Sequence, residues 1–234
     1  MRIPSVLRLT CFSSAASCRP TRHAIKSRGS WRCSADLRPC ENVDERNRLL
    51  AAALEIQQFC DRQGWRYCFI GGIAVQHWGE ARITRDADLT VFTGIGDEPH
   101  YVDAFLGHFQ SRVEAPREFA LSRRVLLLRA SNDTPIDVSL GALGFEEKAV
   151  STSTLEEITQ GTWLRLCSPS ALVVFKAFAG REQDWLDLKG IVHKSRNRVD
   201  WNEVRRDLRE LLDLKGESDS ETIKRLEALV SGGR

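Results

Sequence analysis

Residues 69–89 read FIGGIAVQHWGEARITRDADL. An apolar run typical of a buried strand is interrupted by Gly71 and Gly72, and the stretch ends on Asp86 and Asp88, which are separated by one residue. Alternate residues of a strand point to the same face, so we expect these two carboxylates to project together. Because adjacent carboxylates repel each other, one of them resists ionisation unless a cation lies between them. The stretch therefore indicates either a cation site or the solvated end of a strand, with surface ion pairs to nearby arginines.

A later apolar segment supplies a third carboxylate. In residues 135–140, PIDVSL, the apolar side chains share one face and Asp137 points to the opposite face. Three convergent carboxylates form a set of hard oxygen ligands suited to Mg²⁺. Such a site can hold two ions roughly 3.5–4 Å apart and stabilise an in-line phosphoryl displacement. We therefore predict Asp86, Asp88 and Asp137 as metal ligands and catalytic residues of a two-Mg²⁺ site.

The two glycines fit the same chemistry. Gly71 and Gly72 lie between a predicted strand and the start of a predicted helix, where free N–H groups and the helix dipole favour an anion. Glycine also lets the backbone approach a phosphate closely, although a Gly-Gly pair is also found in ordinary tight turns. The chain has neither a Walker A loop nor a dinucleotide fingerprint, since residues 94–96, GIG, lack the third glycine.

Charge is distributed unevenly along the 234 residues. Residues 1–40 contain eight basic residues and one acid, whereas the remaining 194 residues contain 26 basic and 31 acidic residues. The part expected to fold is therefore mildly acidic, which argues against a surface built for non-specific nucleic-acid binding. No apolar run approaches the roughly 18 residues that span a bilayer, so we predict no membrane segment.

The first 43 residues are predicted to be a basic tail. The segment is rich in Arg and Ser and has no sustained periodicity, which is typical of a transit peptide or a disordered tail. It is also compatible with a non-native extension from an over-extended gene start, because Met1 is the only methionine and Val43 is a candidate GTG start. We expect this segment to play no part in the chemistry.

Cysteine usage favours a reducing compartment. Cys60, Cys68 and Cys167 fall in apolar periodic segments and are expected to behave as small buried hydrophobic residues. The other four cysteines lie in the first 40 residues and lack the spacing of a zinc site. We therefore expect a cytoplasmic protein.

Hydrophobic periodicity predicts an α+β fold with a helical C-terminal part. We expect a core at residues 44–150 and a helical region at 151–234. A turn-rich connection at 131–135 predicts an antiparallel hairpin of the strands that flank it. Ser168 and Asp200 are predicted N-caps, the latter in a capping-box-like start with Glu203. The predicted helices are 45–62, 73–78, 97–109, those beginning at 168 and 200, and 222–230; the predicted strands are 65–70, 87–92, 125–128, 136–140 and 163–167.

Taken together, these motifs resemble the DNA polymerase beta-type nucleotidyltransferase superfamily. Its pattern is an apolar residue with two small residues, then an Asp-x-Asp pair, then a later aspartate between apolar residues. The string GGIAVQHWGEARITRDADL is similar to AbiEii-type and minimal nucleotidyltransferases of bacterial toxin–antitoxin systems. The matching positions are Gly71, Gly72, Ala74, His77, Gly79, Arg82, Thr84, Asp86, Asp88 and Leu89.

A second segment carries the same resemblance. Residues 168–192, SPSALVVFKAFAGREQDWLDLKGIV, resemble the family's helical motif, in which a lysine precedes an arginine and an Asp-x-x-Asp pair. Lys176 is the only charge between Ser168 and Gly180, which favours either a snorkelling side chain or a phosphate contact. Asp184 is expected either to orient that lysine or to form part of a surface ion-pair ladder. The resemblance covers about residues 45–195.

The resemblance implies a mixed sheet flanked by helices and an Mg²⁺-dependent transfer of a nucleoside monophosphate from an NTP to an acceptor hydroxyl. The implied nucleotide-binding residues are Gly71, Gly72, Arg82, Arg85, Lys176 and Asp184. The implied acceptors are a tRNA 3′ end, a protein or a small molecule, and a cognate toxin or antitoxin is an implied partner. The alternatives are a non-catalytic nucleotide- or partner-binding module that keeps this fold, and a structural protein whose acids are surface residues.

Overall fold

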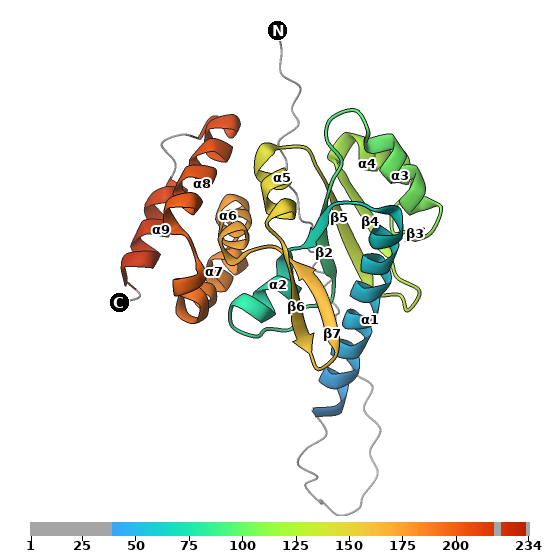
Figure 1. Cartoon of the computed structure of the whole chain (residues 1–234), viewed down its shortest axis with the longest axis horizontal. Coiled ribbons are helices and arrows are strands. Elements are labelled where there is room, and N and C mark those ends of the chain that lie inside the picture. Colours follow the sequence, from blue (N-terminus) through green and yellow to red (C-terminus); the bar gives the residue numbers. More distant parts are fainter. Residues whose placement is uncertain (1–38, 218–220, 233–234) are drawn as a thin grey trace, which may run out of the picture.

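A seven-stranded mixed sheet forms the centre of the protein, in the strand order β3-β4-β5-β2-β1-β7-β6 (Figure 1). The computed structural model describes residues 39–217 and 221–232. The strands are β1 (Tyr67–Phe69), β2 (Ala87–Phe92), β3 (Gln110–Ser111), β4 (Val125–Arg129), β5 (Pro135–Gly141), β6 (Thr154–Thr159) and β7 (Thr162–Leu166).

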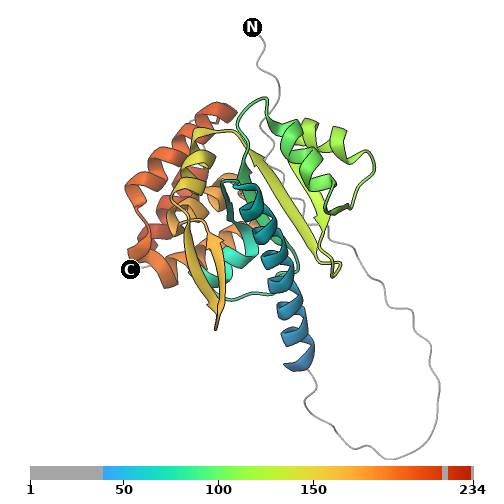
Figure 2. The ribbon, with the colours of Figure 1, turned by 45° about the vertical axis from the view of Figure 1, so that its right-hand side comes forward.

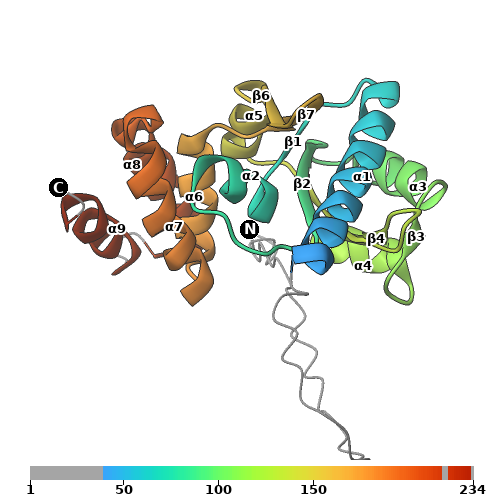
Figure 3. The same ribbon diagram turned by 90° about the horizontal axis from the view of Figure 1, so that it is seen from below.

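Helices cover the sheet and form the C-terminal part of the described chain. They are α1 (Pro39–Gln63), α2 (Gly71–Trp78), α3 (Glu98–Leu106), α4 (Pro116–Arg123), α5 (Gly144–Ser151), α6 (Pro169–Ala179), α7 (Glu182–Ser195), the 3-10 helix η1 (Arg196–Arg198), α8 (Trp201–Lys215) and α9 (Glu221–Gly232). Figure 3 shows α6 to α9 gathered at one end of the molecule, with α9 outermost. The predicted mixed sheet flanked by helices is confirmed.

The central pairing of the sheet is between β2 and β5, which run parallel. Asp88 lies opposite Asp137, and the apolar Leu89 lies opposite Val138. Both apolar residues are fully buried, so the opposite face of each strand carries the acids. The predicted hairpin of β4 and β5 is confirmed, with a turn in which the Ala130 N–H donates to the Thr134 carbonyl oxygen over 2.9 Å.

Helix α1 lies along the sheet between the β6–β7 hairpin and β4 (Figure 2). Its Gln57 amide donates to the Trp163 carbonyl oxygen and accepts from the Arg165 N–H, both over 2.9 Å, which fastens it to β7. Near its start, the Arg48 guanidinium donates to the Asn132 carbonyl oxygen at the β4–β5 turn over 2.7 Å. The Gln57 bonds hold the second half of α1 against β7, and the Arg48 bond holds its first half beside the turn that precedes β5.

Predicted caps start two of the C-terminal helices. Ser168 Oγ accepts from the Ala171 N–H over 3.1 Å at the start of α6. The Asp200 carboxylate accepts from the N–H groups of Asn202 and Glu203 at the start of α8. The other half of the predicted capping box does not form, because the Asp200 N–H donates to Ser170 Oγ over 2.9 Å and the Glu203 carboxylate pairs with Lys148 Nζ of α5 at 2.5 Å.

Some boundaries and elements differ from the prediction. The first described helix begins at residue 39 rather than 45, α2 begins at 71 rather than 73, and β1 spans only 67–69. The short elements β3, α4, α5 and β6 were not predicted. Of these, β6 lies within the region predicted as helical; it is an edge strand held by antiparallel pairing with β7, and its own sequence, TLEEIT, has no clear apolar period.

The predicted domain boundary at residue 150 stays a prediction. One sheet runs across it, and the uninterrupted helical part begins at α6. The predicted tail lies outside the described residues as far as residue 38.

The cysteine prediction is confirmed for the described residues. Cys60, Cys68 and Cys167 are buried free thiols, and burial raises the pKa of the Cys167 thiol to about 12. A cytoplasmic location stays a prediction. Among residues 39–217 and 221–232, no helix is both long enough and apolar enough to cross a membrane.

Replacing Ser168 by alanine removes the cap of α6, the helix that carries Lys176. We expect Ser168→Ala to lower the free energy of unfolding by about 1 kcal/mol, measured by urea denaturation. Ser168→Asp keeps an acceptor oxygen and is expected to stay within about 0.5 kcal/mol of the wild type. Equal losses in the two variants would show that the cap bond contributes nothing.

Candidate functional site

The three predicted carboxylates converge at one end of the sheet. Asp86 immediately precedes β2, Asp88 lies within β2, and Asp137 lies opposite Asp88 on β5. One carboxylate oxygen from each residue lies within 4.8 Å of the others. This convergence follows from the parallel register, because directly paired residues of neighbouring strands point to the same face. Their roles in metal binding and catalysis stay predictions.

The electrostatics of this aspartate triad favour a cation. Burial and the neighbouring charges of Asp86 and Asp137 raise the pKa of Asp88 to about 7, although Lys176 acts in the opposite direction. Burial likewise raises the pKa of Asp137 to about 6, even though the Arg112 guanidinium opposes the rise. Without a bound cation, Asp88 and Asp137 therefore stay protonated at mildly acidic pH, at which ordinary aspartates are ionised. The donors are carboxylate oxygens, which fit Mg²⁺.

The glycines allow the start of α2 to approach the triad. A Cβ on Gly71 would lie 2.0 Å from Asp88 Oδ2, and the residue has a left-handed φ of 59°. A Cβ on Gly72 would lie 2.1 Å from Thr84 Oγ1. The Gly72 N–H donates to Asp88 Oδ2 over 3.4 Å, and the Thr84 hydroxyl donates to Asp86 Oδ1 over 3.0 Å. The helix terminus and the carboxylates therefore share one small space; phosphate binding by the glycines stays a prediction.

Lys176 belongs to a buried ion-pair network that crosses from α6 to α7. Its Nζ lies 2.9 Å from Asp184 Oδ1 and 2.9 Å from Asp187 Oδ2. Arg82, from the loop before β2, binds the same Asp187 with Nε at 2.8 Å and Nη2 at 3.2 Å. Burial lowers the pKa of Lys176, but the two aspartates more than offset this and raise it above its ordinary value. Lys176 is therefore a charged group and does not snorkel to solvent.

The triad and three members of this network, Arg82, Lys176 and Asp184, line one cavity of about 210 Å³. Gly71 and Arg82 contribute to its wall, as do Phe175 and Phe178 of α6 and Gln183 of α7. The cavity thus combines an acidic end with a wall of paired cations and aromatic side chains. Arg85, predicted to contact the nucleotide, is exposed and is not among the lining residues.

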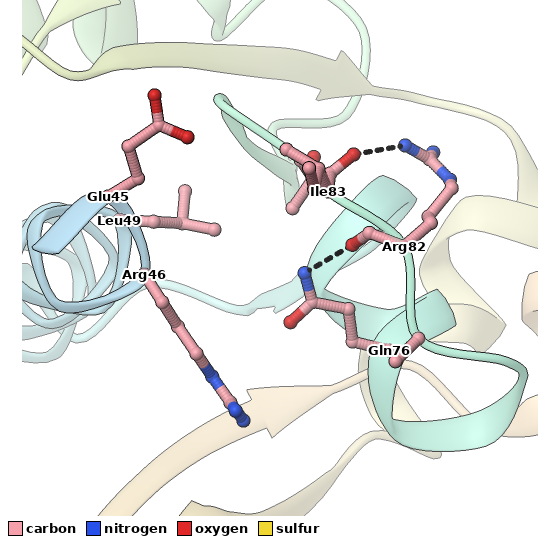
Figure 4. Close-up of a pocket in the computed structure, with 8 residues that line it drawn as sticks. Glu45, Arg46, Leu49, Gln76, Arg82 and Ile83 are labelled. Atoms are coloured by element: carbon pink, nitrogen blue, oxygen red, sulfur yellow. Dashed lines mark hydrogen bonds between the residues drawn. The ribbon is translucent and has the colours of Figure 1, made fainter. Parts of the chain in front are cut away.

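A second cavity, of about 350 Å³, lies between α1 and the loop before β2 (Figure 4). Glu45, Arg46 and Leu49 line it from α1, and Gln76 and residues 81–84 line it from the other side (Figure 4). Within this wall, Gln76 Nε2 donates to the Arg82 carbonyl oxygen over 2.9 Å.

The loop before β2 connects the two cavities. Arg82 lines both of them, and Thr84 of the second cavity is hydrogen-bonded to Asp86 of the triad. Thr84 therefore lies between the second cavity and the acidic end of the first.

Sequence reasoning missed several residues of the site. The most direct is Arg112, whose guanidinium pairs with Asp137 Oδ1. Arg112 follows the two-residue strand β3, which is too short to show an alternation of apolar and polar residues. Nothing in the sequence therefore indicates that Arg112 lies near β5. Asp187 was recognised only as part of a helical motif, and its bond to Arg82 spans 105 positions of the chain. The second cavity also depends on how α1 packs, which no local pattern specifies.

Comparison with known proteins gives limited similarity. The chain matches no protein-family model and no curated protein sequence. Among solved structures, an antigenic nucleotidyltransferase-like protein from Paracoccidioides brasiliensis is similar at 16% identity and a TM-score of 0.46, over 78% of this chain and 93% of that one. A lincosamide antibiotic adenylyltransferase bound to lincomycin is similar at 12% identity and a TM-score of 0.42, over 60% of this chain and 94% of that one.

The raised pKa values predict how stability depends on pH. Asp88 and Asp137 keep their protons in the folded metal-free protein up to about pH 7 and 6, whereas in the unfolded chain they release them near pH 4. We therefore expect the free energy of unfolding in EDTA to fall as pH rises from about 4 to 7. Urea unfolding across this range is expected to show a smaller fall for Asp88→Asn. An unchanged slope in that variant would contradict the assignment.

Substitution of Gly71 tests the close approach of α2 to the triad. Gly71→Ala must displace the Asp88 carboxylate, so we expect it to abolish stabilisation by Mg²⁺ in thermal unfolding at pH 7.5. Gly64 is a matched control, because it has a similar φ of 68° with open space around it. Gly64→Ala is expected to cost about 1 kcal/mol of backbone strain and to keep the Mg²⁺ response. Loss of the response in both variants would point to general destabilisation.

Proposed function

We propose that this protein is a nucleotidyltransferase that moves a nucleoside monophosphate from an NTP to an acceptor hydroxyl, with Mg²⁺ held by Asp86, Asp88 and Asp137. The observation that carries the proposal is the convergence of three carboxylates, within 4.8 Å, against the N-terminus of α2. An acidic site draws in cations, and a helix N-terminus favours anions. Their contact suits a ligand that is itself a metal-bound anion, such as a nucleoside triphosphate.

The triad residues would hold the metal. Bound Mg²⁺ would supply charge neutralisation of the triphosphate and would make the acceptor hydroxyl a better nucleophile near neutral pH. Asp137, on the strand next to Asp88, would accept the proton of that hydroxyl as it attacks the α-phosphate. The bond from the α-phosphate to the pyrophosphate breaks in the same displacement, so pyrophosphate is the leaving group.

The phosphates would lie between the first turn of α2 and the ion-pair network. The Gly72 N–H at the start of α2 donates to Asp88, and Lys176 lines the same cavity. Because Asp184 and Asp187 fix Lys176 at 2.9 Å from each carboxylate, its ammonium is positioned before any ligand arrives. A preorganised charge of this kind contributes more to binding than a mobile one. The aromatic side chains of Phe175 and Phe178 offer an apolar surface for a nucleobase.

The acceptor would enter through the second cavity. This cavity has the volume of a small-ligand site, and Thr84 joins it to the triad. Its lining combines one acid, Glu45, with two arginines, Arg46 and Arg82, and with the apolar residues Leu49 and Ile83. These groups suit a polar hydroxyl-bearing acceptor, and the classes that the resemblance implies are a tRNA 3′ end, a protein or a small molecule.

The finer family assignment rests on sequence motifs alone. The match over residues 71–89 supports the polymerase beta-like superfamily and, within it, the AbiEii-type group with its toxin–antitoxin partners. Within this motif, the Gly72 N–H donates to Asp88 and the Thr84 hydroxyl donates to Asp86. Gly72 and Thr84 also lie so close together that a Cβ on Gly72 would not fit, which gives a physical reason for the spacing of the motif.

The proposal predicts transfer that depends on the triad. With an α-labelled NTP, Mg²⁺ and bacterial lysate as the acceptor source, we expect label in RNA, protein or a small molecule. Asp86→Asn, Asp88→Asn and Asp137→Asn are each expected to lower the rate at least about a thousandfold, since each removes several kcal/mol of charge stabilisation. Asp103→Asn is the control, because Asp103 is an exposed partner of Arg117 away from the cavity.

The outcomes separate the alternatives. Mg²⁺-dependent NTP binding without transfer of label would identify a binding module that keeps the fold. Near-normal transfer by a triad variant would contradict the mechanism. If there were neither binding nor transfer, the triad would be a structural acidic cluster.

A further inference from the structure

Arg112 is a cationic side chain that pairs directly with a triad carboxylate, Asp137. It follows β3, and its backbone N–H donates to the Leu127 carbonyl oxygen of β4 over 2.8 Å. Leu127 lies opposite Asp137 in the β4–β5 pair. The side chain of Arg112 therefore reaches across β4 to β5, and its guanidinium donates to Asp137 Oδ1.

The guanidinium is held in place at an energetic cost. The Arg112 side chain is 20% exposed and that of Asp137 is 7% exposed, so the ion pair is largely shielded from water. Arg112 Nε is buried and has no hydrogen-bond partner among the described residues. An unsatisfied buried donor is unfavourable, so the attraction of the triad must hold this arginine in place.

Charge counting gives the consequence. The ionised triad carries three negative charges, and Arg112 cancels one of them in direct contact. The other cations that line the cavity, Lys176, Arg82 and Arg181, pair with Asp184 or Asp187. The triad together with Arg112 therefore matches the charge of a single divalent ion.

The hydrogen bonds indicate where that ion would bind. Asp86 and Asp88 receive their hydrogen bonds from neutral groups, the Thr84 hydroxyl and the Gly72 N–H. Because both donors are neutral, neither cancels the negative charge that attracts a metal ion. Asp137, in contrast, is already paired with a cation, the Arg112 guanidinium.

We propose that Arg112 occupies the place of a second divalent ion at Asp137, so that the metal-free site takes up one ion alone and a second only together with a nucleoside triphosphate. The phosphates of the nucleotide supply the negative charge that a second ion needs. Without them, the positive charge of Arg112 opposes binding of that ion. Arg112 is thus a positioning residue that couples metal loading to nucleotide binding. The inference relies on the proposed function for its nucleotide step only.

The test is a Mn²⁺ titration of the full chain followed by the electron paramagnetic resonance signal of free Mn²⁺. We expect the wild type to bind one ion without nucleotide and two with a non-hydrolysable NTP analogue. Arg112→Gln is expected to bind two ions without nucleotide, with the second dissociation constant lowered about tenfold or more, because a unit charge next to the site is removed. Arg112→Lys keeps the charge and is expected to bind one.

Two controls make the result specific. Arg124→Gln removes an arginine of the same 20% side-chain exposure, one that pairs with Glu98 instead of the triad, and it is expected to bind one ion as the wild type does. Asp86→Asn/Asp88→Asn identifies the ions that belong to the triad. Thermal unfolding checks that each variant is folded.

Each outcome decides between the claims. If Arg112→Gln folds and still binds a single ion without nucleotide, Arg112 does not control loading. Two ions in the nucleotide-free wild type would overturn the role of Arg112 and leave the proposed transfer intact. If the wild type bound no Mn²⁺ with or without the analogue, both this inference and the proposed function would fail.

Discussion

The repulsion of three carboxylates is the constraint on which the rest of this structure depends. Parallel pairing of β2 and β5 places Asp88 opposite Asp137, and the residue two positions before Asp88 adds a third acid on the same side. Burial of such a group is costly unless the surroundings supply positive charge or hydrogen bonds. The first turn of α2, the Thr84 hydroxyl and Arg112 supply part of this compensation.

The C-terminal helices complete the site. Lys176 of α6 and the aspartates of α7 form a buried network that reaches back to Arg82 in the loop before β2. Removing one partner of such a network would strand a buried charge, so its members act together. The network fixes the loop before β2, which contributes to the walls of both cavities, and it presents a positive group to the acidic end of the first. Sheet and helices therefore form one site, although they are distant in sequence.

Part of this site could be predicted from local patterns. The alternation in residues 86–89 and 135–140 was enough to place Asp86, Asp88 and Asp137 on polar faces, and the strand-to-helix position of Gly71 was also correct. Arg112 could not be found, because its partner is set by the register of a two-residue strand. Arg85, which the resemblance implied as a nucleotide-binding residue, is exposed, and its role stays a prediction. Local periodicity assigns faces, whereas tertiary packing decides which faces meet.

The most direct test of the triad as a metal site is anomalous diffraction from crystals grown with Mn²⁺ and a non-hydrolysable NTP analogue. The account predicts anomalous peaks between the carboxylates of Asp86, Asp88 and Asp137, with the triphosphate of the analogue against the first turn of α2. If the analogue were bound elsewhere and the triad showed no anomalous peak, the central claim would be wrong.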